Sequence, residues 1–244
     1  MKTKIICVGS GKRGIGKTSL SINLIPYLLS QGIKPKLFDF DWENTDKSGL
    51  QNFYPEAQKL NIHSARALDE FFEAVDNPAI NTILADLPAG SGEEVSCWCD
   101  EVYSEASELE MEFILAAVTT NEAGSVQSTL KWGAYLQDQV KYIVCLNELA
   151  EKNSTFKYWH YEPKVKEFID CFSPQIMKMH SIPLDLESEL RNQMVTLDQV
   201  AKGEINHNFL SKTKNKVRAK IAQRTLFNEL DKVSELLISP SSHG

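Results

Sequence analysis

The stretch GKRGIGKT at residues 11–18 decides the fold, because it fits the pattern of a glycine, any four residues and then Gly-Lys-Ser or Gly-Lys-Thr. Glycines let successive backbone N–H groups curl around a polyphosphate, the lysine reaches the terminal phosphates, and the threonine hydroxyl holds Mg²⁺. A strand-like apolar run at 4–8 precedes the stretch and a helix-compatible run at 18–30 follows it. The pattern therefore predicts a phosphate-binding loop, and its two flanks disfavour the alternative of a glycine-rich surface turn.

The predicted loop and the start of the helix behind it form one candidate surface for a nucleotide. The N-terminus of that helix adds its own attraction for anions. The residues that we expect to contact the nucleotide are Gly11, Lys12, Arg13, Gly14, Ile15, Gly16, Lys17, Thr18 and Ser19.

The composition predicts one α/β domain. With 42% hydrophobic residues the 244-residue chain can bury one large core, and we expect residues 1–238 to form it and the polar tail 239–244 to be disordered. No apolar run approaches the ~20 residues that span a bilayer, and the N-terminus leads directly into a strand. We therefore expect a soluble, cytoplasmic protein whose five cysteines are reduced thiols.

Apolar runs typical of strands alternate with helix-compatible stretches along the chain. The predicted strands are 4–8, 36–40, 82–86, 112–118 and 141–146, with a sixth plausible at 176–182. The predicted helices are 18–30, 64–75, 93–109, 121–138 and 155–171, with a long one, continuous or broken, from about 205 to 237. Such alternation predicts a mostly parallel sheet with helices on both faces, the architecture of P-loop NTPases.

Acidic side chains follow two of the predicted strands, at the edge where open parallel sheets bind their ligands. Asp39 and Asp41 come at the end of the strand at 36–40, and Asp86 ends the strand at 82–86. A hydrophobic run that ends in an aspartate is how phosphate-loop enzymes hold Mg²⁺ through water. The alternatives are solvated loop acids for the first two and a helix N-cap for Asp86. The upstream loop favours a metal-phosphate site.

Together these motifs resemble the deviant Walker A ATPases of the ParA/MinD family. The resemblance rests on Lys12 with Gly-Lys-Thr at 16–18, on Asp39-x-Asp41, and on Asp86 followed by Pro-Ala-Gly at 88–90, and it covers roughly residues 1–150. In that family the loop usually reads K-G-G-x-G-K-T-[ST]. Lys12 matches the signature lysine, whereas Arg13 replaces the first glycine, which could narrow the loop or add positive charge near the phosphates.

The resemblance implies a homodimer joined by Mg²⁺ and ATP, in which Lys12 of one subunit reaches the phosphates bound by the other. Hydrolysis of ATP to ADP and phosphate, expected to be slow and stimulated by a partner, then separates the pair. The catalytic residues implied in this way are Lys12, Lys17 and Asp41. Lys17 would bind the β- and γ-phosphates, and Asp41 would position the attacking water.

The same resemblance implies the cofactor contacts outside the loop. The expected metal ligands are Thr18, Asp41 and Asp86, with Asp39 as a supporting neighbour. Asn147, at the end of the fifth strand, and Pro183 are expected beside the adenine base. An Asn at a strand end is as often a turn former, so both base contacts also have an ordinary structural explanation.

A basic segment near the C-terminus suggests what such a switch would act on. No Asp or Glu occurs between residues 205 and 228, and on a helix four basic residues form one ridge: Lys212, Lys216, Lys220 and Arg224. The ridge suits non-specific binding to a DNA backbone, whose affinity would fall steeply with salt. The alternatives are a solvated helix face and, for the apolar stripe at residues 226, 230, 233 and 237, insertion into a membrane interface. Membrane is the less favoured surface, because acids interrupt that stripe.

The function expected from these features is a positional switch that uses ATP to gate DNA binding, in plasmid or chromosome partition or in cargo positioning on the nucleoid. A conjugation ATPase of the TraL type is also consistent with Asp39, Asp41 and Asn44. An adaptor or activator protein is expected, and the acidic stretch 93–105 could receive a basic one. A less favoured alternative is an iron–sulfur carrier using Cys97 and Cys99, and another is a small-molecule kinase or ligase of related fold.

Overall fold

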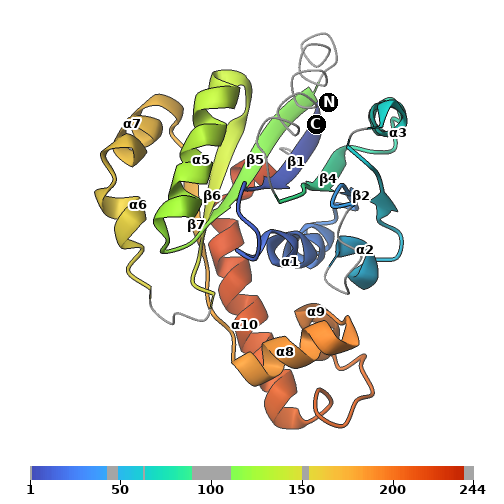
Figure 1. Ribbon diagram of the computed structural model, residues 1–244. Helices are drawn as coiled ribbons and strands as arrows, with labels where there is room; N and C mark the ends of the chain where they lie inside the picture. Colours follow the sequence, from blue (N-terminus) through green and yellow to red (C-terminus); the bar gives the residue numbers. More distant parts are fainter. Residues whose placement is uncertain (1, 43–48, 63, 90–110, 150–153, 239–244) are drawn as a thin grey trace, which may run out of the picture.

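The computed structural model describes residues 2–42, 49–62, 64–89, 111–149 and 154–238, and it contains one seven-stranded sheet (Figure 1). The strand order is β3-β2-β4-β1-β5-β6-β7, and every neighbouring pair is parallel. The strands are β1 Thr3–Gly9, β2 Lys36–Asp39, β3 Gln58–Lys59, β4 Thr82–Asp86, β5 Met111–Thr119, β6 Lys141–Asn147 and β7 Gln175–Met179. The predicted parallel sheet is therefore confirmed; β3, only two residues long, left no recognisable pattern.

Helices cover both faces of the sheet, as predicted. The strands are buried on both sides, so consecutive residues of β1 alternate between two cores: Ile5 and Cys7 belong to one, and Ile6 and Val8 to the other. The first core packs against α3 Ala65–Val75, α5 Ala123–Leu136, α6 Lys157–Tyr161 and α7 Pro163–Phe172. The second packs against α1 Lys17–Ser30, α2 Leu50–Phe53, the end of α10 Thr213–Asp231 and α11 Ser234–Leu237.

Two predicted helices are wrong in their bounds. The helix expected at 155–171 is two helices, because Pro163 cannot continue α6 and instead occupies the first turn of α7, where Glu162 caps it. The final helix begins at Thr213 instead of near 205, and it breaks between α10 and α11 at residues 232–233. The helix expected at 93–109 and the tail at 239–244 lie outside the described residues.

A third, smaller core lies beyond the edge of the sheet where α1 begins, and sequence reasoning did not anticipate it. It joins α8 Leu184–Gln193, α9 Leu197–Lys202 and the first half of α10, through Leu186, Leu190, Val200, Leu210 and Ala219. Figure 1 shows these helices below the sheet, with α10 running from them up to β7. We call α8, α9 and residues 213–222 of α10 the C-terminal lobe.

The apolar stripe at residues 226, 230, 233 and 237 is part of the hydrophobic core. Leu226, Leu230, Val233 and Leu237 are at most 7% exposed and pack beneath the sheet, which leaves no stripe to enter a membrane. Among the described residues, no helix is long and apolar enough to cross a membrane. In the aromatic segment 156–161, Phe156 and Trp159 are buried in the core, whereas Tyr158 and Tyr161 are exposed.

Candidate nucleotide site

The loop between β1 and α1 has the backbone that a phosphate cradle requires. Gly14 and Gly16 have φ values of 74° and 95°, in the left-handed region that favours glycine. A Cβ at Gly16 would also lie 2.2 Å from Nδ2 of Asn147, whereas one at Gly14 would meet nothing within 4 Å. Arg13 is not among the residues with positive φ, so the arginine that departs from the family pattern fits the loop without backbone strain.

Lys17 is the buried cation of the loop. Its side chain is almost fully buried, and Nζ donates a hydrogen bond to the carbonyl oxygen of Lys12 at 3.2 Å. Burial lowers the pKa of Lys17; the carboxylates of Asp86 and Asp41 oppose this effect, and the positive charge of Arg13 adds to it. A buried ammonium group that lines a cavity is well placed to receive an anion.

Asp86, at the end of β4, lies beside the start of α1. Its Oδ1 accepts a 2.7 Å hydrogen bond from the hydroxyl of Ser21, and the nearby hydroxyl of Thr18 also helps to hold the pKa of this carboxyl group down. Burial raises the pKa of Asp86 to about 7, and these hydroxyl groups limit the increase. Oδ2 is buried and has no hydrogen-bond partner. The second oxygen therefore remains available for a cation or its water.

The end of β2 places two further carboxylates at the same edge of the sheet. Asp39 is fully buried, and it accepts hydrogen bonds from the backbone N–H groups of Asp41 and Gln51, both at 3.1 Å. Burial raises the pKa of Asp39, while those two hydrogen bonds oppose the rise. Asp39 thus holds the backbone that carries Asp41, and Asp41 lines the cavity. Glu43 and Asn44 lie outside the described residues.

These residues fit Mg²⁺ bound together with a nucleotide. Thr18 and Asp86 present oxygen atoms of the kind that Mg²⁺ prefers. A hydrated Mg²⁺ ion would also supply the partner that the buried Oδ2 of Asp86 lacks. Within the described part of the chain, no group of three or more His, Cys, Asp or Glu side chains could hold a metal ion alone. That is the usual situation for Mg²⁺, which takes one or two carboxylates and completes its shell with phosphates and water. Cys97 and Cys99 lie outside the described residues.

A cavity of about 730 Å³ opens in front of the loop. The loop and α1 line one wall through Arg13, Lys17, Thr18 and Ser19, and the C-terminal lobe lines the other. The lobe residues in this wall are Glu187, Leu190, Arg191, Leu197, Arg218 and Ile221, and Pro183 just before α8 and Val195 between α8 and α9 lie beside them. The volume lies in the range of small-molecule and cofactor sites, and one wall is cationic while the other is largely apolar. Pro183 was expected at the nucleotide, but the sequence did not predict that the other residues of this wall would complete the cavity.

The two expected base contacts are both found on the cavity wall, but Asn147 also has a structural task. Its Nδ2 donates to the carbonyl oxygen of Ile15 at 2.7 Å, and its Oδ1 accepts from the N–H of Leu149 at 3.1 Å. The amide of Asn147 therefore supports the loop from β6. Pro183 precedes α8 and accepts hydrogen bonds from the first turn of that helix.

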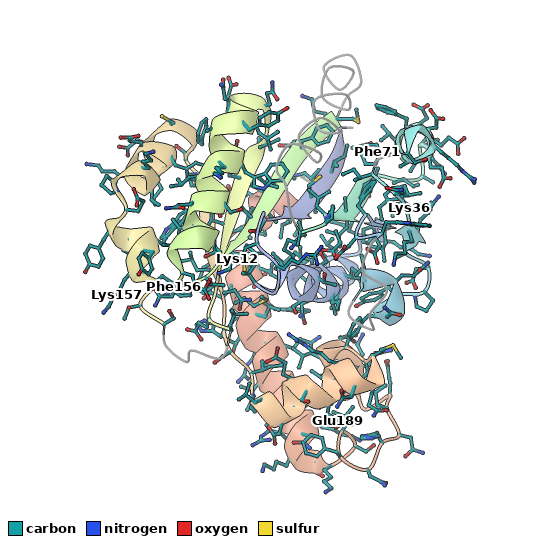
Figure 2. All side chains as sticks on the ribbon, viewed as in Figure 1. Lys12, Lys36, Phe71, Phe156, Lys157 and Glu189 are labelled. Carbon is teal, nitrogen blue, oxygen red and sulfur yellow. The ribbon has the colours of Figure 1, made fainter. Side chains whose placement is uncertain are left out.

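Two residues of α5 also hold the loop, and sequence reasoning missed both. Ser128 Oγ accepts a 2.6 Å hydrogen bond from the N–H of Gly11. Glu122, just before α5, forms an ion pair with Lys12, whose side chain lies at the N-terminal end of that helix in Figure 2. Neither residue belongs to a motif, and only the packing of α5 beside β1 and β5 brings them to the loop.

The predicted basic ridge is only partly continuous. Lys212, Lys220 and Arg224 are exposed, as is Lys214. Lys216 is half-buried, with Nζ 3.2 Å from the position of a Cβ on Gly203, so its stem lies against the lobe. Residues four apart drift around a helix, so such a ridge winds away from a single face over three steps.

The parallel sheet and the glycine-built loop between β1 and α1 give this α/β chain an architecture that resembles that of P-loop NTPases. No protein-family model matches the sequence, and no curated protein matches it either. Solved structures with similar folds include the kinds of protein that the motif resemblance named.

MinD from Aquifex aeolicus matches at 17% identity and a TM-score of 0.49, over 93% of this chain and 97% of that one. A nucleotide-binding protein in complex with ADP from Archaeoglobus fulgidus matches at 17% identity and 0.46, over 78% and 87%. A plasmid partition protein from Borrelia burgdorferi matches at 14% and 0.43, over 80% and 95%. At such scores the similarities carry no argument about function, which rests on the residues of the site.

Proposed function

We propose that the chain is a Mg²⁺-dependent ATPase that acts as a molecular switch: it dimerises with ATP bound and separates after hydrolysis. The observation that carries the proposal is the pairing of a glycine-built loop and buried Lys17 with Asp86, whose second carboxyl oxygen has no partner. A polyphosphate with Mg²⁺ satisfies both groups at once, because it supplies the anion for Lys17 and the cation for Asp86.

Within this proposal each residue has a task in positioning and charge neutralisation. Lys17 and the backbone N–H groups of the loop hold the phosphates, and Thr18 and Asp86 hold the Mg²⁺, which neutralises charge on the phosphoryl group when bound. Asp41, fixed by Asp39, orients the attacking water. Lys12 of a second subunit adds positive charge, so ATP joins the two copies.

The direct experiment measures nucleotide binding, phosphate release and oligomeric state together. Mg-ATP should bind, phosphate should form without any other substrate, and light scattering should show a dimer with ATP and a monomer with ADP. A Lys12→Ala variant should lose dimerisation and hydrolysis together. A chain that binds no nucleotide would overturn the proposal, and phosphate transfer to an added small acid would favour a kinase or ligase.

We further propose non-specific DNA as the surface on which the switch acts, since the exposed cations of α10 at 212, 214, 220 and 224 support it. The test is duplex DNA binding with ATP, ADP or no nucleotide across a salt series. Lys220→Glu with Arg224→Glu should weaken ATP-dependent binding and reduce the log–log salt slope by about 1 for each DNA phosphate that the variant no longer neutralises. Lys164→Glu with Lys166→Glu, the same charge change on α7, is the matched control. Equal weakening in both pairs would contradict a specific role for α10.

A further inference from the structure

The loop carries three cationic side chains within six residues, and they differ in burial and in whether they line the cavity. Lys17 is buried in the cradle, Arg13 is exposed and lines the cavity, and Lys12 is not among the described residues that line it. Lys12, which the family pattern would place on the phosphates of a second subunit, does not line the cavity of its own subunit, whereas Arg13, which the pattern lacks, does.

The direction of Lys12 has a visible cause in α5. The Lys12 side chain is paired with the carboxylate of Glu122. The backbone of Glu122 is fixed, because its carbonyl oxygen accepts hydrogen bonds from the first turn of α5, among them one from Ser125 Oγ at 2.8 Å. Ser128 of the same helix binds the N–H of Gly11. Helix α5 thus holds both the start of the loop and the lysine that follows it.

Arg13 has the position and the chemistry to supply a cation to the phosphates bound by its own subunit. Arg13 and Lys17 both line the cavity in front of the loop, so the two cations border the same space. The backbone of Arg13 is unstrained, since the left-handed positions of the loop fall on Gly14 and Gly16. A guanidinium group also presents a planar fork of donors that suits phosphate oxygens, which an ammonium group does not.

We propose that Arg13 is the loop cation that contacts the phosphates within a single subunit, and that Glu122 holds Lys12 away from them until a second subunit competes for it. This inference rests on the proposed function, because it assigns residues of the same site. It makes binding of the nucleotide independent of Lys12, and it reserves Lys12 for the dimer. The Lys12–Glu122 pair is exposed, so the restraint is weak enough to be exchanged.

The first test measures the affinity of Mg²⁺ with a fluorescent, non-hydrolysable ATP analogue for dilute protein that light scattering shows to be monomeric. Arg13→Ala should weaken binding by about tenfold or more, Arg13→Lys by less, and Lys12→Ala by less than about twofold. Arg66→Ala, which removes an exposed arginine on α3, is the matched control and should bind like the unaltered chain. Thermal unfolding of each nucleotide-free variant checks that the fold is retained.

The second test addresses Glu122 through the monomer–dimer equilibrium at saturating analogue. Glu122→Gln should favour the dimer about two- to fivefold, because it frees Lys12, and Glu73→Gln, an exposed acid on α3, should not. Arg13→Ala binding as well as the unaltered chain, or Lys12→Ala weakening monomer binding as much as Arg13→Ala, would overturn the inference and leave the proposed ATPase standing. An unaltered chain that does not bind the analogue would overturn both.

Discussion

Two buried lysines lie at opposite edges of the sheet, Lys4 near the start of β1 and Lys17 at the start of α1, and their surroundings differ in a way that separates structure from function. Lys4, 3% exposed, donates to the carbonyl oxygens of Glu235 and Leu236 at 3.2 and 2.5 Å, and it lies 3.6 Å from the carboxylate of Glu112. Lys17, 7% exposed, donates to one loop carbonyl and faces a cavity.

The contrast follows from the cost of burying a charge. An ammonium group removed from water is stable only where acceptors or an opposite charge replace that water. At the amino end of the sheet the chain supplies them, so Lys4 fastens the last helix to β1. At the carboxyl end much of the compensation is left to a ligand, which is why the same kind of residue there indicates a binding site.

The largest expected effect comes from removing the lysine at the carboxyl end. Lys17→Ala should abolish measurable Mg-ATP binding, a loss of at least about a hundredfold, because the phosphates lose their buried cation. The melting temperature of the nucleotide-free protein should stay within a few degrees, since a poorly compensated charge is removed. Fluorescence titration and calorimetry measure the two quantities, and a normal affinity in this variant would contradict the site.

The two left-handed glycines of the loop should differ in the same assay. Gly16→Ala should reduce nucleotide affinity severely, because the new Cβ both strains the backbone and collides with the amide of Asn147. Gly14→Ala strains the backbone but meets open space, so it should cost about 1–2 kcal/mol of loop stability and a smaller part of the affinity. Equal losses in both variants would show that the contact with Asn147 does not matter.

At the amino end the expected effect is on stability and not on binding. Lys4→Met keeps most of the apolar stem but leaves two carbonyl oxygens without their donor, so the free energy of unfolding should fall by about 2 kcal/mol. Affinity for Mg-ATP should be unchanged. Urea unfolding beside the nucleotide titration checks both, and a variant that loses affinity while remaining folded would break the comparison.

A further prediction tests the carboxyl end of the sheet through the pH dependence of stability. Burial raises the pKa of Asp86 from 3.8 to about 7, so the folded chain binds the proton more tightly than the unfolded chain. The free energy of unfolding of the Mg²⁺-free protein should therefore fall as pH rises from about 4 to about 7. Asp86→Asn should flatten this dependence. Urea unfolding at pH 5 and pH 7.5 measures it, and an equal slope in the variant would assign the dependence to other groups.

Parts of the site that depend on neighbouring residues could be predicted. Gly16, Lys17 and Thr18 follow one another, and Asp86 ends an apolar run, so spacing along the chain predicts both the loop and the carboxylate. The parallel sheet then follows from the alternation of strands and helices. Ser128 and Glu122 could not be found in this way, because they belong to α5 and reach the loop only through packing.

The basic ridge shows that helical spacing alone does not predict which side chains stay exposed. Helical spacing predicted that Lys212, Lys216, Lys220 and Arg224 form one basic ridge. The lobe takes Lys216 against Gly203, and Arg218 pairs with Asp185 at 2.9 Å. Helical periodicity places residues on faces, but the neighbours that cover each face come from other parts of the chain.

The sequence by itself determined the phosphate loop, the order of the main strands and the acids at their ends, because each depends on the chemistry and spacing of residues close together in the chain. Only the tertiary structure decided that the C-terminal lobe lines one wall of the cavity, that Glu122 at the start of α5 pairs with Lys12, and that Arg13 lines the cavity. The physical reason is that burial and charge pairing depend on which distant segments pack together, and local spacing does not specify those contacts.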